Sequence, residues 1–294
     1  IPGNGAAALT GVGVAFPLIM IISAFAALVG NGGAPRASIL MGKKDLDSAE
    51  NILGNCFTMQ IIISVILTLI MFFGNRTFFM AFGASENTIE YAVSYMNIYS
   101  LGTIFVQLTL GMNAFITAQG FAKTGMYSVL IGAVINIILD PIFIFACHMG
   151  VRGAALATII SQACSCIWVL SFLFGTRSTL RIKKQNLTLK APVILPCLAL
   201  GLSLFIMQAS ESIISVCFNS SLLKYGGDVA VGAMTILTSV MQFAMLPLQG
   251  LGQGAQAIMS YNYGAKNTER VKGTFLLLLK ASLTYSIILW GLVM

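Results

Sequence analysis

Long apolar runs separated by short polar links make up most of this 294-residue sequence. About 20 apolar residues span the hydrocarbon core of a bilayer as a helix. A β-barrel would instead need strands of about ten residues that alternate apolar and polar positions, and the runs do not alternate in this way. The pattern therefore predicts an all-α integral membrane protein with eight transmembrane helices, at residues 9–30, 51–74, 89–118, 126–148, 153–175, 192–219, 229–259 and 270–294.

Composition supports this fold class and excludes several functions. Hydrophobic residues make up 57% of the chain and charged residues only 9%, whereas soluble domains carry roughly 25% charged residues. A soluble enzyme or a nucleic-acid-binding domain is therefore excluded. The six cysteines lie in apolar runs and the chain has one histidine, which is neither a disulfide framework nor a zinc pattern. Because no nucleotide-binding loop or hydrolase motif is present, we expect neither catalysis nor a cofactor.

The basic residues predict how the chain is oriented in the membrane. Twelve of the 16 lysines and arginines lie in the links after the first, third, fifth and seventh segments. Only three lie in the other links, and Lys280 lies within the last segment, where its long side chain can reach the interface. Cytoplasmic links carry the excess of positive charge in multi-pass proteins. We therefore expect a plasma-membrane protein whose first, third, fifth and seventh links are cytoplasmic.

Two of these links resemble each other. GNGGAPRASILMGKK follows the first segment and GQGAQAIMSYNYGAK follows the seventh. At an offset of 222 they share Gly30, Gly32, Ser38, Gly42 and Lys44 with Gly252, Gly254, Ser260, Gly264 and Lys266. Segments seven and eight map onto segments one and two, which predicts a six-helix repeat and a whole protein of about twelve helices, one before this chain and about three after it. Secondary transporters are often built from such repeats. The predicted parts are an N-terminal lobe at 1–175, a basic inter-lobe linker at 176–191 and a partial C-terminal lobe at 192–294.

An acid inside the fourth segment is the first candidate for a functional site. Intramembrane charges are expensive and mark functional sites by default. Asp140 lies four residues after Asn136, on the same helical face, and the next residue, Pro141, disturbs the helix. Thr158 lies at a similar depth on the next segment. These oxygens suit a small cation, and a buried acid can also carry a proton. The alternative is a structural Asp–Asn pair that packs two helices.

A second acid, Glu211, lies at a comparable depth in the sixth segment, beside several serines and glutamines. One acid in each lobe would suit cation transport, although neighbouring polar groups could equally satisfy Glu211. Other polar residues within the segments could form the walls of a substrate cleft, although no spacing singles one out; the candidates are Gln107, Asn113, Gln208 and Gln242.

Three stretches of the chain resemble the multidrug and toxic compound extrusion (MATE) transporters. They are GNGGAPRASILMGKKDLDSAE, NIILDPIFIF with MGVRGAALATIISQ, and PLQGLGQGAQAIMSYNYGAK. The resemblance implies a twelve-helix, two-lobe antiporter that expels cationic amphipathic drugs in exchange for Na⁺ or H⁺. It also implies a cation site at Asn136, Asp140 and Thr158, and a functional acid at Glu211. An aspartate of the family's first helix would precede residue 1, and Ser203 stands where a proline is frequent.

The sequence therefore predicts part of a cation-coupled multidrug antiporter that works as a monomer in the bilayer, with a small-molecule drug as its substrate and no nucleic-acid partner. One alternative is a related flippase for lipid-linked sugars, which would need basic residues around its cavity to hold a pyrophosphate. Another is a membrane scaffold without a transport cycle, whose polar residues would only pack helices.

Overall fold

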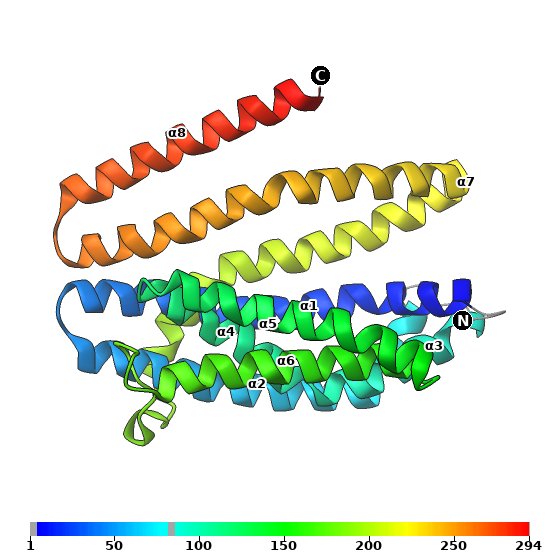
Figure 1. Ribbon diagram of the computed structural model, residues 1–294, viewed down its shortest axis with the longest axis horizontal. Helices are drawn as coiled ribbons and strands as arrows, with labels where there is room; N and C mark the ends of the chain where they lie inside the picture. Colours follow the sequence, from blue (N-terminus) through cyan, green and yellow to red (C-terminus); the bar gives the residue numbers. More distant parts are fainter. Residues whose placement is uncertain (1–4, 82–85, 294) are drawn as a thin grey trace.

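Helices make up nearly all of the structure, a computed structural model that describes residues 5–81 and 86–293. Figure 1 shows long helices lying side by side, with α8 on the outside of the helical bundle. The described residues contain no strand. The helices are α1 Gly5–Gly42, α2 Leu46–Ala81, α3 Glu86–Leu101, α4 Thr103–Ala118, α5 Ala122–Pro141, α6 Val151–Phe174, α7 Ala191–Gly264 and α8 Thr268–Val293, with a π-helical turn η1 at Ile142–Ala146 and a 3-10 turn η2 at Lys184–Asn186.

Most of the predicted membrane spans are present, with differences at 89–118 and at 229–259, which is not among the spans found in the described residues. Within the described residues, six helices are long and apolar enough to cross a membrane. The predicted segment 89–118 is not one straight helix: α3 and α4 meet at Gly102 with a bend of 58°. Taken as one broken span, this pair is a seventh. A side chain at Gly102 would force α6 or its Ile159 side chain to shift, because the added Cβ would overlap that side chain.

The two predicted segments 192–219 and 229–259 lie in one helical run. The 74 residues of α7 would be about 110 Å long if straight, at 1.5 Å per residue, which is several times the thickness of a bilayer core. Figure 1 shows that α7 instead folds back on itself, so that two antiparallel stretches lie next to each other. We call residues 191–211 the outgoing arm and residues 240–264 the return arm.

Helix α1 lies at the centre of the packing and contacts both arms of α7. Its approach to the outgoing arm uses two glycines: a Cβ on Gly32 would overlap the Cys197 carbonyl oxygen, and a Cβ on Gly201 would overlap that of Leu28. Small residues allow such close backbone contact between membrane helices.

The return arm is held in the same reciprocal way. A Cβ on Gly42 would overlap the Tyr261 carbonyl oxygen, and a Cβ on Gly264 would overlap that of Ile39. These four positions are related by the 222-residue offset, since 39 maps to 261 and 42 maps to 264. We call this contact the glycine closure. It joins the two parts of the chain at the end where the basic links lie.

The links that follow these two glycines have the same backbone conformation. Lys44 and Lys266 both adopt a left-handed conformation, with φ of 64° and 58°. The amide of each lysine donates a hydrogen bond three residues back, to Met41 and to Tyr263, at 2.9 and 3.1 Å. The sequence similarity of the two links is therefore matched by a common backbone conformation at both helix ends, while the six-helix repeat stays a prediction.

The two helices that follow also begin alike. Asp45 Oδ1 accepts a hydrogen bond from the Ser48 amide at 3.1 Å, and Asn267 Oδ1 accepts one from the Arg270 amide at 3.1 Å. Both are N-cap interactions at the same repeat position. The hydrogen bonds from Ser48 also hold the pKa of Asp45 below its usual value, because they stabilise the charged carboxylate.

The basic linker after α6 is fixed to the preceding helices. Gln119 Oε1 accepts hydrogen bonds from the Ser178 hydroxyl and the Leu180 amide, both at 2.9 Å. Glu50 of α2 accepts a hydrogen bond from the Arg181 amide at 3.2 Å and pairs with Lys183. The linker start therefore belongs structurally to the α1–α6 part of the chain.

The glycine closure gives the first prediction. Gly264→Ala in the full-length protein should push the return arm away from α1, because the added methyl group would meet the Ile39 carbonyl; such overpacking costs roughly 1–3 kcal/mol. We expect faster amide hydrogen exchange in residues 39–45 and 261–267 together, measured by mass spectrometry. Gly273→Ala is the matched control, since a Cβ there meets nothing within 4 Å among the described residues. Unchanged hydrogen exchange at both helix ends would contradict the role of the glycine closure in holding the return arm against α1.

Candidate functional site

The structure places Asn136 and Asp140 together near the end of α5. The Asn136 side-chain amide lies 3.4 Å from Asp140 Oδ1 and donates to it, as expected for residues one helical turn apart. Both side chains are half-buried. Pro141 ends α5 and the chain continues as the π turn η1, so the helix is distorted directly after the acid. Backbone distortion of this kind is frequent at functional sites.

Tyr95 of α3 connects this pair to α6. It is almost fully buried, with 6% of its surface exposed. The Tyr95 hydroxyl interacts with the Thr158 side chain, and the same hydroxyl lies close enough to the Asp140 carboxylate for an electrostatic interaction. The Thr158 hydroxyl donates to the Ala154 carbonyl of its own helix at 2.9 Å, which leaves its oxygen able to accept. Three helices thus bring Tyr95, Asn136, Asp140 and Thr158 into one cluster, which we call the acid cluster.

Sequence reasoning did not find Tyr95. Within a long apolar segment, a tyrosine that joins a polar cluster looks the same as one that only packs. The signal that could have found it is its position one turn before Tyr99, which places two hydroxyl-bearing rings on one face; the two rings stack with their centroids 5.8 Å apart.

Glu211 lies apart from the acid cluster. Its side chain is exposed at the end of the outgoing arm of α7, and no interaction found between the described residues joins it to Asp140, Asn136 or Thr158. The predicted role of Glu211 as a second acid therefore stays a prediction.

A cavity of about 600 Å³ lies between α1, α4 and α5 on one side and both arms of α7 on the other. Ligand sites for small molecules are typically of this size. Among the described residues, six amide side chains line it alongside apolar and small residues, and none of the lining residues is charged. The amides are Asn31, Asn113, Gln208, Gln249, Gln253 and Gln256.

Two of the four predicted cleft residues line this cavity, namely Asn113 and Gln208. The other two do not. Gln107 is fully buried, and its amide donates to the Ile22 carbonyl at 2.6 Å, so that it braces α4 against α1. Gln242 is exposed on α7 and is not part of the lining.

Three cavity residues that the sequence analysis missed follow a helical pattern. Gln249, Gln253 and Gln256 are spaced i, i+4, i+7, which puts them on one face of the return arm. This spacing was visible in the sequence and could have identified them. Facing them from α4, Asn113 has a buried Oδ1 without a hydrogen-bond partner among the described residues. The cavity can therefore offer amide donors and acceptors to a ligand, but no fixed charge.

The two sites differ in chemistry and share one helix. The acid cluster supplies a carboxylate, an amide and two hydroxyl groups, all of them hard oxygen ligands or donors. The cavity supplies neutral amides and apolar surface. Helix α5 contributes Val129 to the cavity and Asn136 and Asp140 to the acid cluster.

Comparison with known proteins agrees with this architecture. The chain is 27% identical over 266 residues to the multidrug export protein MepA of Staphylococcus haemolyticus, covering 90% of this chain and 58% of MepA. Among solved structures, a ligand complex of the MATE multidrug transporter DinF-BH is 36% identical, with a TM-score of 0.91, and the match covers all of this chain and 65% of that one. An outward-facing conformation of a multidrug resistance MATE family transporter of the MOP superfamily is 26% identical, with a TM-score of 0.90 and coverage of 100% and 65%.

The chain thus spans somewhat less than two thirds of the length of the relatives it matches. The MatE family model matches residues 2–142 and 203–294, which include α1 to α5, most of α7 and all the described residues of α8. Because the family model matches most of the sequence and the fold agrees with a solved MATE transporter, the chain belongs to the MATE family of multi-pass membrane transporters.

Proposed function

We propose that the full-length protein is a secondary antiporter that exports cationic, amphipathic drugs across the plasma membrane in exchange for Na⁺ or H⁺. The observation that carries the proposal is the pairing of an intramembrane acid cluster with a separate, amide-lined cavity between two parts of the chain. The names of the relatives, multidrug export protein and MATE multidrug transporter, support the drug as the exported cargo.

The acid cluster is the proposed ion site. Asp140 supplies the charge, and Asn136, Thr158 and Tyr95 supply neutral oxygens around it. A carboxylate among neutral ligands can hold a small cation or take up a proton, and either event removes an uncompensated charge from the membrane interior. The proposed ion is monovalent, because the single carboxylate of this cluster balances a single positive charge.

The cavity is the proposed drug site. Its amides can hydrogen-bond drugs of different shapes, while its apolar residues bury aromatic surface. None of the described residues that line it is basic, whereas the rival cargo, a lipid-linked sugar, carries a pyrophosphate that would call for basic partners. The cavity therefore favours a drug.

Exchange requires that ion and drug prefer different conformations. If the basic links lie in the cytoplasm, as their positive charge predicts, the glycine closure would close the cytoplasmic end of the contact between α1 and α7. Ion binding at the acid cluster would then shift α5, and with it the cavity wall at Val129. Coupling of this kind is a difference in affinity between two states.

Removing the charge of Asp140 tests the ion site. Asp140→Asn in the full-length protein, expressed in a drug-sensitive host, should lower drug resistance and dye export at least about tenfold, because the amide can neither balance a cation nor carry a proton. Expression is matched by immunoblot. Glu269→Gln, at an exposed acid in the first turn of α8, is the control and should behave like the wild type. Resistance retained by Asp140→Asn would remove this residue from the mechanism.

Removing one hydroxyl tests whether Tyr95 belongs to the same site. Tyr95→Phe keeps the buried ring and loses the interaction with Thr158. One hydrogen bond is worth roughly 0.5–1.5 kcal/mol, so the Na⁺ or H⁺ concentration for half-maximal export should change by about 2- to 10-fold while the maximal rate is retained.

Tyr99→Phe provides the control for this measurement, because Tyr99 is an equally buried ring that stacks on Tyr95 one turn away. Equal ion dependence in the wild type and both variants would mean that Tyr95 only packs.

A further inference from the structure

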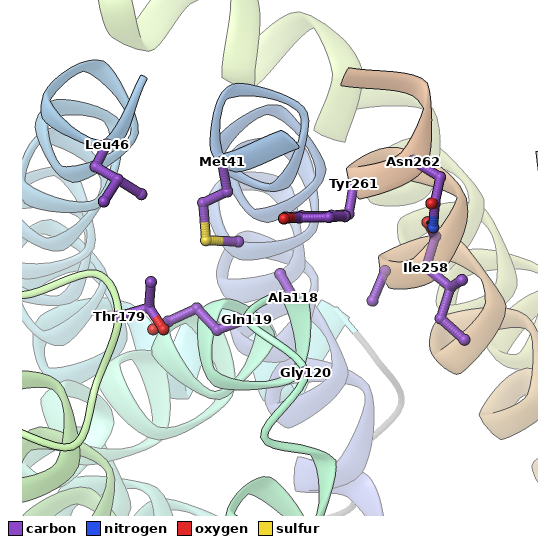
Figure 2. Close-up of a pocket in the computed structure, with 10 residues that line it drawn as sticks. Met41, Leu46, Ala118, Gln119, Gly120, Thr179, Ile258, Tyr261 and Asn262 are labelled. Carbon is purple, nitrogen blue, oxygen red and sulfur yellow. The ribbon is translucent and has the colours of Figure 1, made fainter. Parts of the chain in front are cut away.

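A second cavity of about 430 Å³ lies at the basic-link end of the molecule. Figure 2 shows its lining: side chains from the end of α1, the start of α2, the end of α4, the basic linker and the return arm of α7 surround one space. We call it the link-end chamber. Its lining residues are Met41, Leu46, Ala118, Gln119, Gly120, Thr179, Ala257, Ile258, Tyr261 and Asn262.

Only a thin partition separates this chamber from the central cavity. Ala118 of α4 and Ala257 of α7 line both spaces. Between them lies Ser38 of α1, which is fully buried. Its hydroxyl lies 3.2 Å from the Ala257 carbonyl and 3.4 Å from the Ala118 carbonyl. Two methyl side chains and one hydroxyl therefore stand between the two cavities, and the Ser38 hydrogen bonds cross between the two parts of the chain.

The position of the chamber matters because of the seam on which it lies. Both cavities lie where α1 and α4 face the return arm of α7. The glycine closure forms the next contact along this seam. Met41 of the chamber directly precedes Gly42 in the chain, and Tyr261 of the chamber carries the carbonyl that Gly42 approaches. The two cavities are therefore neighbours along this seam, with Ala118 and Ala257 between them.

Two polar side chains of the chamber wall are held by hydrogen bonds, whereas two neighbouring residues of the return arm are exposed. Gln119 is held by its bonds to Ser178 and Leu180, and the Asn262 amide donates to the Ile258 carbonyl at 2.8 Å. By contrast, Tyr261 is 46% exposed and Ile258 51% exposed. In Figure 2 the Tyr261 ring extends toward Met41, with Leu46 and Thr179 across the space.

The chemistry of this wall selects a class of ligand. None of the lining residues is charged, so the chamber does not neutralise an ion. An aromatic face and a thioether favour flat, polarisable groups, and methionine adapts to different shapes. A tyrosine face also attracts a delocalised cation.

We propose that the link-end chamber is a second binding site for the exported drug, which holds its planar aromatic part against Tyr261 and Met41 on the basic-link side of the Ser38 partition. This site rests on the proposed function, because it takes the same cargo as the central cavity. It makes export a transfer between two chambers, in which opening the partition lets the drug pass from one to the other.

The test maps where a planar aromatic cation binds. Purified full-length protein is irradiated with the aryl azide of ethidium, and the modified peptides are identified by mass spectrometry. We expect adducts in residues 41–46 and 258–262, in addition to adducts in 246–256 of the central cavity. Thr179→Trp should fill the link-end chamber and lower its adducts at least fivefold. Tyr261→Ala removes the aromatic face and should lower these adducts by a similar factor. Both variants should retain the central adducts.

Two controls separate a ligand site from a change in structure. Tyr261→Phe keeps the ring and should retain the link-end adducts. Ile167→Trp adds the same bulk to an α6 residue that is 65% exposed and lines neither cavity, so both sets of adducts should remain. The variants are also assayed for ethidium export, which Thr179→Trp should slow severalfold.

The outcomes distinguish this site from the proposed function. Adducts confined to the central cavity, with ethidium exported, would overturn the second chamber and leave the antiporter proposal intact. Export by Thr179→Trp at the wild-type rate would also overturn it. Link-end adducts that Thr179→Trp abolishes, in a protein that exports no ethidium and has no central adducts, would support the binding site and contradict the proposed function.

Discussion

The arrangement of this protein depends on how closely α1 can approach α7. At Gly32 and Gly201, and again at Gly42 and Gly264, each glycine faces a backbone carbonyl of the other helix with no room for a side chain. In a bilayer the hydrophobic effect does not drive helices together, because lipid is as apolar as the helix surface, so close packing at small residues has to hold them. The position of the cavities follows, because both lie along the seam that these contacts define.

This kind of contact suits a part that has to separate. The contact at these glycines is made by backbone atoms, and no ion pair between the described residues crosses it, so its opening separates no pair of opposite charges. The Ser38 hydroxyl adds a single polar tie across the same seam. On the proposed function, the linker start would move with the α1–α6 part, since Glu50 and Gln119 hold it there. The angle between the two parts of the chain would then change close to Lys190, directly before α7 begins at Ala191 and Pro192.

Much of this arrangement could be predicted from sequence, for physical reasons that differ from feature to feature. Hydropathy predicted the spans because each has to match the same membrane thickness. The repeat was visible because Gly42 and Gly264 cannot change without a clash. Asn136 and Asp140 were found because a polar pair one turn apart stands out in an apolar segment. The bend at Gly102 was not found, because neither helix loses its apolar character there.

The cavity residues show where such reasoning fails. Gln107 and Asn113 belong to the same helix and the same chemical class, yet Gln107 donates to the Ile22 carbonyl inside the packing while Asn113 faces the cavity. Residue type alone cannot distinguish an amide that packs two helices from an amide that lines a cavity, because hydrogen bonds can satisfy both within an apolar segment. Spacing can, where an amide recurs on one face, as Gln249, Gln253 and Gln256 do. An amide that packs two helices needs one hydrogen-bond partner at one position along the helix. A surface that binds varied ligands needs donors and acceptors repeated along its length. The amide periodicity of the return arm is therefore a better guide to the proposed drug site than any single polar residue of the described chain.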